Sequence, residues 1–240
     1  AIPNTLIFTH TVNLLTHKFE FANVHPDFLT DRQYEWLALQ RNVKKIIQLH
    51  GDASVRFLTD EDCKTSIRNV VNASLGEELV GYFKAEQAGM LKADLCRGTA
   101  LYETGGIYLD VDLGVRMNLF GVLNNSTEFA TVKVHNHSKY RDGFFQALTS
   151  VVPRHPVIFL DIELFAEYYR GAFPEYRNGG DTPIGVMLLK QAYRDVNASQ
   201  FEYLERTTEL WTELLYELGM ERNLLRGVAP PTWGTARSCR

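Results

Sequence analysis

A helix, a turn and a strand follow one another in the segment Leu101-Tyr102-Glu103-Thr104-Gly105-Gly106-Ile107-Tyr108-Leu109-Asp110-Val111-Asp112-Leu113. Apolar residues recur at helical spacing over 86–104, which predicts an amphipathic helix. Gly105 and Gly106 are expected to end that helix and to turn the chain. Residues 107–112 then predict an apolar strand. This unit is typical of layered α/β folds.

Two carboxylates, Asp110 and Asp112, interrupt the predicted strand. In an extended chain, residues two apart point to the same face, which would place these two acids roughly 6 to 7 Å apart at the Cα level. A divalent cation relieves the repulsion between them, and hard oxygen donors suit Mg²⁺ or Mn²⁺. The carboxyl end of a strand is where open α/β sheets place ligands. The alternative is a strand end that has already left the sheet, with Asp112 beginning a turn before Gly114.

Helices and strands alternate along the rest of the chain. Short apolar runs predict strands over 5–9, 55–58 and 129–134. Helices are predicted from a capping box at Thr30 and Gln33 to Gly51, after a cap at Asp60, and over 157–169, 182–193 and 201–218. This alternation favours an α/β fold, with a mostly parallel sheet flanked by helices, as a single domain spanning residues 1–240.

Composition and charge narrow the class of protein. Hydrophobic residues make up 45% of the chain and charged residues 22%, which is typical of a soluble globular protein and excludes disorder, collagen and disulfide-dense miniproteins. The formal charge of −4 provides no broad cationic surface, so we expect no nucleic-acid partner. No apolar run approaches the ~20 residues of a bilayer span, so we expect no membrane contact from this segment. Whether an anchor precedes Ala1 stays open.

Five asparagines stand in the glycosylation pattern Asn-x-Ser/Thr, namely Asn72, Asn124, Asn125, Asn136 and Asn197. The pattern indicates passage through a glycosylating lumen, although Asn and Ser also favour turns. On these triplets alone, a eukaryotic host predicts a Golgi-type secretory-pathway lumen, and any other host the cytoplasm. The cysteines Cys63, Cys96 and Cys239 have no metal-ligand spacing, leave at least one thiol unpaired and indicate no compartment.

Several other residues are weaker candidates for a functional site. His135 and His137 share one face of a strand, but a solvated strand end accounts for them better than a zinc site. Asp161 and Glu163 do not share a face of their predicted helix, and we expect both to be solvated. Asp181 either caps the following helix or reaches a sugar or acceptor. The chain has no P-loop, no Gly-x-Ser-x-Gly and no Gly-x-Gly-x-x-Gly after a strand.

Asp94 and Arg97 stand at positions i and i+3 of the helix predicted before the glycine pair. From the residues alone they form an ordinary ion pair, worth about a few tenths of a kcal/mol. As a site, they would direct a carboxylate and a guanidinium at the hydroxyls and phosphates of a polyol ligand.

Taken together, these residues carry a resemblance. The segments Ala93-Asp94-Leu95-Cys96-Arg97 and Ala100 to Asp112 resemble the signature block of the DXD-containing sugar-transferase family. That family includes the yeast initiating α-1,6-mannosyltransferase, α-1,4-galactosyl- and N-acetylglucosaminyltransferases, and the glucosylating domain of clostridial toxins. Weaker similarities extend over most of the chain, at Ile2-Pro3, Phe57-Leu58-Thr59-Asp60, His155-Pro156 and Thr182-Pro183-Ile184-Gly185.

The resemblance implies a GT-A-like, Rossmann-like fold, a nucleotide-sugar donor, Mn²⁺ or Mg²⁺, and transfer with retention of anomeric configuration. Carried onto matching positions, it makes Asp112 a metal ligand, and Asp110 a ligand of the metal or of the donor ribose and sugar. Asp94 and Arg97 would hold hydroxyls of the donor sugar. Tyr108 would line the donor pocket beside them.

The donor-binding set implied by the resemblance also includes Gly106, His10 and Trp233. His10 stands where the family usually has a tryptophan, so it would either stack on the base or bond the nucleotide. Thr232-Trp233 resembles a Ser-Trp pair that closes over the diphosphate in relatives. A tryptophan that packs a C-terminal tail is the alternative. Pro183 follows Thr182 rather than the family's usual glycine, so that loop receives no assigned contact.

The sequence therefore predicts a metal-dependent, retaining glycosyltransferase that moves a sugar from a UDP- or GDP-linked donor to a saccharide or glycoprotein acceptor. Two other functions stay open. One is a non-catalytic module on the same fold that binds nucleotide-sugar or carbohydrate. The other is a glycoside hydrolase, whose two acids must lie on opposite sides of the sugar, an arrangement that two acids on one strand face fit poorly.

Overall fold

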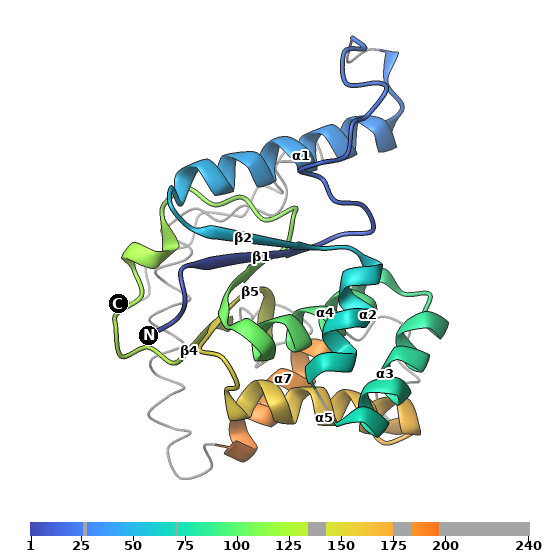
Figure 1. The fold of residues 1–240 in the computed structure, drawn as a ribbon, viewed down its shortest axis with the longest axis vertical. Coiled ribbons are helices and arrows are strands. Elements are labelled where there is room, and N and C mark those ends of the chain that lie inside the picture. Colours follow the sequence, from blue (N-terminus) through green and yellow to red (C-terminus); the bar gives the residue numbers. More distant parts are fainter. Residues whose placement is uncertain (26–27, 71, 134–142, 175–183, 197–240) are drawn as a thin grey trace, which may run out of the picture.

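The structure is a computed structural model that describes residues 1–25, 28–70, 72–133, 143–174 and 184–196. Its centre is a five-stranded sheet in the order β2-β1-β3-β5-β4 (Figure 1). The strands are β1 (Thr5–Thr9), β2 (Ser54–Leu58), β3 (Gly106–Leu109), β4 (Phe129–Lys133) and β5 (Phe144–Val151). The helices are α1 (Asp31–Leu49), α2 (Asp60–Val70), α3 (Ala73–Ala85), α4 (Gly89–Thr104), α5 (Pro156–Arg170) and α7 (Ile184–Val196), with a 3₁₀ turn, η2 (Leu119–Gly121).

Strand direction confirms the expected α/β class. Strands β2 and β3 both pair with β1 in parallel, whereas β5 pairs antiparallel with β3 and with β4. Four of the described strands therefore run in one direction, and β5 alone runs against them. The sheet is mostly parallel as predicted, but β5 was not predicted at all.

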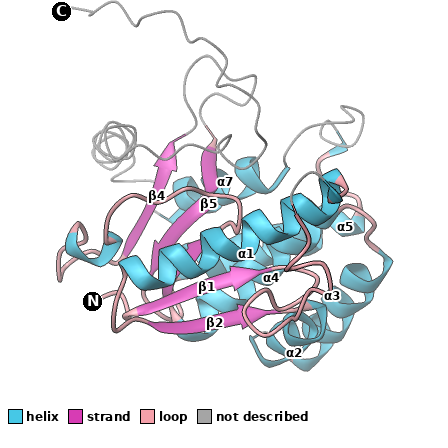
Figure 2. Cartoon of the chain, turned by 90° about the horizontal axis from the view of Figure 1, so that it is seen from above, coloured by secondary structure: helices cyan, strands magenta, loops and turns pink. Residues whose placement is uncertain are grey.

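The sheet separates two apolar cores. On one face, Leu6 and Phe8 of β1 pack with Val43 and Ile46 of α1. On the other face, Ile7 packs with the helices α2 to α7. Figures 1 and 2 show α1 lying across one face of the sheet, with α2, α3, α4, α5 and α7 grouped on the opposite face. Because neighbouring strand residues alternate between faces, each core receives every second side chain of β1.

Helix starts follow local capping chemistry. The predicted capping box is present, since the Gln33 N–H donates to Thr30 Oγ1 and the Thr30 N–H donates to Gln33 Oε1. The predicted cap at Asp60 is wrong, because Asp60 is the first residue of α2. Instead the N–H and hydroxyl of Thr59 both donate to Asp62, at 2.9 and 2.6 Å. The Asp60 carboxylate is thereby left for another partner.

The turn from α4 to β3 requires its two glycines. Gly105 has φ +61° and Gly106 has φ +117°, a region that side chains rarely adopt. A Cβ on Gly105 would lie 2.7 Å from Pro153, and one on Gly106 would lie 2.6 Å from the carbonyl oxygen of Thr5. The glycine pair therefore lets the backbone of β3 lie close to the backbone of β1 in the sheet.

Other boundaries differ from the sequence prediction. Strand β3 ends at Leu109 and not at residue 112. Helix α4 begins at Gly89, three residues later than predicted, and α7 is described only from Ile184 onward. The predicted helix over 201–218 lies outside the described residues. Within the described part of the chain, no helix combines the length and apolar character needed to cross a bilayer.

Candidate active site

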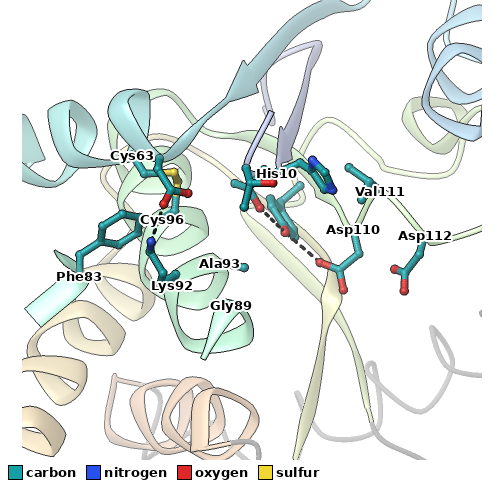
Figure 3. A pocket seen from close by; sticks show the side chains of 14 residues that line it. His10, Cys63, Phe83, Gly89, Lys92, Ala93, Cys96, Asp110, Val111 and Asp112 are labelled. Atoms are coloured by element: carbon teal, nitrogen blue, oxygen red, sulfur yellow. Dashed lines mark hydrogen bonds and ion pairs between the residues drawn. A yellow bond between two sulfur atoms is a disulfide. The ribbon is translucent and has the colours of Figure 1, made fainter. Parts of the chain in front are cut away.

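A cavity of about 370 Å³ opens where the strands β1, β2 and β3 end (Figure 3). Its size lies at the lower end of the range typical of small-molecule sites. The cavity is lined by residues at and after the ends of β1 and β3 and by residues of α2, α3 and α4, namely Thr9, His10, Thr11, Asp60, Cys63, Phe83, Gly89, Lys92, Ala93, Cys96, Tyr108, Asp110, Val111 and Asp112. It therefore lies at the edge of the sheet where α/β folds bind ligands.

Asp110 and Asp112 both line this cavity, but from a turn. The Asp110 N–H still donates to the Ala147 carbonyl at 2.9 Å, and the Leu113 N–H then donates back to the Asp110 carbonyl at 3.0 Å. The two acids therefore do not share one face of an extended strand, and the prediction of that geometry is wrong. The alternative, a strand end that has left the sheet, is the arrangement found, and Figure 3 shows both side chains at one end of the cavity.

Beneath this turn, Arg97 is the centre of a buried polar network. Its guanidinium donates to the carboxylate of Asp94 and to Oε1 of Gln146. One nitrogen also lies 3.8 Å from Asp110 Oδ1, and the guanidinium lies over the Tyr108 ring at 4.8 Å. Asp94 and Arg97 are only 6% and 4% exposed. An ordinary surface ion pair is therefore the wrong interpretation of these two residues, because this pair is buried.

Tyr108 connects the network to the cavity. Its hydroxyl donates to Asp110 Oδ1 at 2.8 Å and lies 3.0 Å from Thr9 Oγ1. Burial raises the pKa of Tyr108 well above its usual value, and the charge of Asp110 raises it further. The phenol therefore stays protonated and holds the Asp110 carboxylate in place.

Charge balance explains why these groups tolerate burial. Burial by itself would lower the pKa of Arg97, but the charges of Asp94 and Asp110 help to raise it, so the guanidinium stays charged. Burial raises the pKa of Asp94, and the adjacent Arg97 opposes that rise. An isolated buried charge is expensive, so the single arginine stabilises the acids around it.

Asp161 corrects the expectation of a solvated charge. It is 3% exposed, and within the described residues its Oδ1 has no hydrogen-bond partner. Burial raises its pKa well above the usual value, and Arg97 opposes this rise. The sequence does contain a signal for this burial, because Asp161 lies on the same helical stripe as Ile158, Ile162 and Phe165.

Sequence reasoning missed Gln146, and it included Gly185 in the family resemblance without assigning it a contact. The amide of Gln146 accepts from Arg97 and donates to the Gly185 carbonyl at 2.6 Å. A Cβ on Gly185 would collide with the carboxylate of Asp94, so α7 packs directly against the network. The run Phe144 to Val151, rich in aromatic and branched residues, could have indicated β5 and thus Gln146.

Of the other residues predicted to bind the donor, only some line the cavity. His10 lines the cavity, with Nδ1 about 3.2 to 3.3 Å from the backbone of Val12, and burial lowers its pKa. Gly106 does not line the cavity and lies at the other end of β3, against Thr5. Trp233 lies outside the described residues, as do His135, His137, Asp181, Thr182, Pro183 and Thr232.

A disulfide joins Cys63 of α2 to Cys96 of α4, and both cysteines line the cavity. The sequence indicated neither this pairing nor its position. Cys239, the third cysteine, lies outside the described residues. The bridge ties together the two helices that supply one wall of the cavity.

The donor set at Asp110 and Asp112 fits a hard divalent cation with few protein ligands. Mg²⁺-type sites commonly use one or two carboxylates and complete their shell with substrate phosphates and water. Among the described residues, no group of three or more His, Cys, Asp or Glu side chains could hold a metal by itself. Two carboxylates facing a cavity are thus compatible with a cation that binds together with a phosphate ligand.

A family model described as "Glycosyltransferase sugar-binding region containing DXD motif" matches residues 12–132, half of the 240-residue chain. The chain belongs to this glycosyltransferase family. Its DXD motif is Asp110-Val111-Asp112, in the turn at the cavity.

Two solved glycosyltransferase structures resemble this DXD glycosyltransferase. The PaToxG glycosyltransferase has a TM-score of 0.48 and 17% identity, over 95% of this chain and 80% of that one. A glycosyltransferase involved in glycosylation of the major capsid of PBCV-1 has a TM-score of 0.33 and 12% identity, over 71% of this chain and 70% of that one. A search of curated proteins found no match.

Proposed function

We propose that this glycosyltransferase moves a sugar from a nucleotide-sugar donor to a saccharide or glycan acceptor, with Mn²⁺ or Mg²⁺ bound at Asp110 and Asp112. One observation carries the proposal. The two DXD carboxylates face a cavity at the carboxyl edge of the sheet, and one of them is held by the network of Tyr108 and Arg97. A nucleoside diphosphate brings the oxygens that two carboxylates alone do not supply.

Each residue then has a proposed role. Asp112 binds the metal, and Asp110 binds the metal or the donor ribose and sugar. Tyr108 keeps Asp110 oriented through its 2.8 Å hydrogen bond. Asp94 and Arg97 are buried beneath the turn and do not line the cavity, so they support the sugar site, on the side nearest β5, through Asp110 and Tyr108. Groups whose positions are fixed before the donor binds lose little entropy on binding, which favours such a buried network.

The bound cation would neutralise charge that builds up on the departing diphosphate. We propose transfer with retention. The acceptor oxygen attacks the anomeric carbon on the face from which the diphosphate leaves. As the bond to the diphosphate breaks, the acceptor proton passes to the leaving phosphate oxygen. Within this scheme the carboxylate of Asp94, which is buried and engaged by Arg97, forms no bond to the sugar.

We also propose that, if the host is eukaryotic, the protein works in the secretory-pathway lumen. Disulfides persist in oxidising compartments, and the Cys63–Cys96 bridge supports this compartment. The exposed Asn72 stands in a glycosylation triplet. The Asn72 side chain also caps α3 by accepting from the Leu75 N–H at 2.9 Å, so the turn-forming role of this asparagine is present as well.

The test is release of nucleotide from a panel of UDP- and GDP-sugars with Mn²⁺, with Mg²⁺ and with a chelator. We expect turnover of one donor that requires metal and is lost in Asp112→Asn. The matched control is Asp52→Asn, which removes one exposed carboxylate elsewhere on the molecule. Full activity of Asp112→Asn, or turnover that ignores the chelator, would overturn the proposal. Metal-dependent donor binding without transfer to any acceptor would favour the non-catalytic binding module.

A further inference from the structure

The end of the cavity away from the DXD turn contains a second polar group, the pair Asp60–Lys92. Lys92 Nζ donates to Asp60 Oδ2, and Nζ lies 4.6 Å from the centre of the Phe83 ring (Figure 3). The side chains of Lys92 and Asp60 are 23% and 40% exposed. This pair plays no part in the network around Arg97, so its role in the cavity is unassigned.

The order of the strands indicates what this end of the cavity receives. Asp60 follows β2, His10 follows β1, and the DXD turn follows β3, while Gln146 of the Arg97 network comes from β5. If, as the proposed function has it, the diphosphate lies at the DXD turn and the sugar lies toward β5, the nucleoside must extend toward β1 and β2. The base then reaches Asp60 and Lys92.

We propose that Asp60 and Lys92 recognise guanine, so that the donor is a GDP-sugar; this inference rests on the proposed function. Read from Lys92 outward, the pair offers a donor, the ammonium, and then two acceptors, the carboxylate oxygens. The Watson–Crick edge of guanine presents the complementary series of an acceptor, O6, and two donors, N1–H and N2–H. Lys92 has three N–H donors, so it can bond O6 while it keeps Asp60.

Uracil and adenine match this pattern less well. Uracil presents O4, N3–H and O2, so its third group would place a carbonyl oxygen against a carboxylate oxygen. Adenine presents an amino group where the ammonium needs an acceptor. The Lys92 ammonium covers the Phe83 ring, so the apolar floor left for any of the three bases is the Cys63–Cys96 bridge. The floor therefore contributes affinity, and the polar pair contributes selectivity.

The experiment is calorimetric binding of GDP and UDP to the full chain in the presence of Mn²⁺. For the native chain we expect GDP to bind about tenfold to a hundredfold more tightly, the discrimination typical of a good bidentate contact to a base. Asp60→Asn replaces one acceptor by a donor and creates the series complementary to uracil. We expect this variant to lose affinity for GDP and to gain affinity for UDP, a gain that misfolding cannot produce.

The matched control is Glu61→Gln, which removes the same charge from the next residue. Glu61 does not line the cavity and pairs with Lys64 on the surface, so we expect its nucleotide preference to equal that of the native chain. Tighter binding of UDP by the native chain, or equal effects of Asp60→Asn and Glu61→Gln, would overturn the guanine assignment and leave the proposed function standing. Failure of both nucleotides to bind with Mn²⁺ would instead overturn the proposed function, and the guanine assignment with it.

Discussion

Removing the Cys63–Cys96 disulfide should cost the fold several kcal/mol. The bridge closes a loop with a sequence separation of 33 residues. Loop-closure entropy for that length corresponds to about 3.5 to 4 kcal/mol at 25 °C, a large part of the 5 to 15 kcal/mol by which domains are typically stable. Both cysteines are buried, so their sulfur atoms also contribute packing that an alanine would lose.

Urea unfolding with and without a thiol reductant separates these two contributions. Reduction of the native chain keeps both sulfur atoms and removes only the covalent link, so we expect a loss of about 3 to 4 kcal/mol. The double variant Cys63→Ala/Cys96→Ala should lose somewhat more, and its unfolding should not respond to the reductant. If the oxidised and reduced native chains unfold with free energies within about 1 kcal/mol of each other, the loop-closure reasoning fails.

Three further changes test the site and its supports. Tyr108→Phe removes the hydroxyl that holds Asp110, and we expect about 1 kcal/mol less stability in urea unfolding and weaker donor binding. Asp161→Asn removes a buried acid whose raised pKa makes the native fold lose stability as pH rises above the unfolded value of about 3.9. The unfolding free energy of the variant minus that of the native chain should therefore be larger at pH 7 than at pH 4. The same difference at pH 4 and at pH 7 would contradict this. Gly105→Ala should cost more than about 2 kcal/mol, because it combines a positive φ with a collision, whereas Gly51→Ala, at a similar φ in open space, should cost about 1 kcal/mol.

Features set by neighbouring residues could be predicted from the sequence. The capping box at Thr30 and the glycine pair before β3 depend on contacts over a few residues, and both are present. The DXD acids were placed correctly at the edge of the sheet, because an apolar strand ending in acids must deliver them there. The geometry of the two acids was wrong, because the exact end of a strand depends on its neighbours: β3 stops at Leu109, where the chain turns.

Features set by distant residues could not be predicted in this way. The placement of Gln146 beside Arg97 depends on β5 inserting antiparallel between β3 and β4, and no local pattern specifies a neighbour in a sheet. Asp161 is a different case, because its helical stripe was visible in the sequence. A charged residue is expected to be solvated even on an apolar stripe, because acids are rarely fully buried unless they are paired.

The burial of Asp161 and of Asp94 has one physical explanation. Both carboxylates influence the same guanidinium, that of Arg97, which also lies 3.8 Å from Asp110. Burial raises the pKa of both Asp161 and Asp94, and the charge of Arg97 opposes the rise in each case. Asp110, the acid nearest the cavity, is oriented by the Tyr108 hydroxyl and by Arg97. The deep acids and the arginine thus form a support that fixes one DXD carboxylate before any donor arrives.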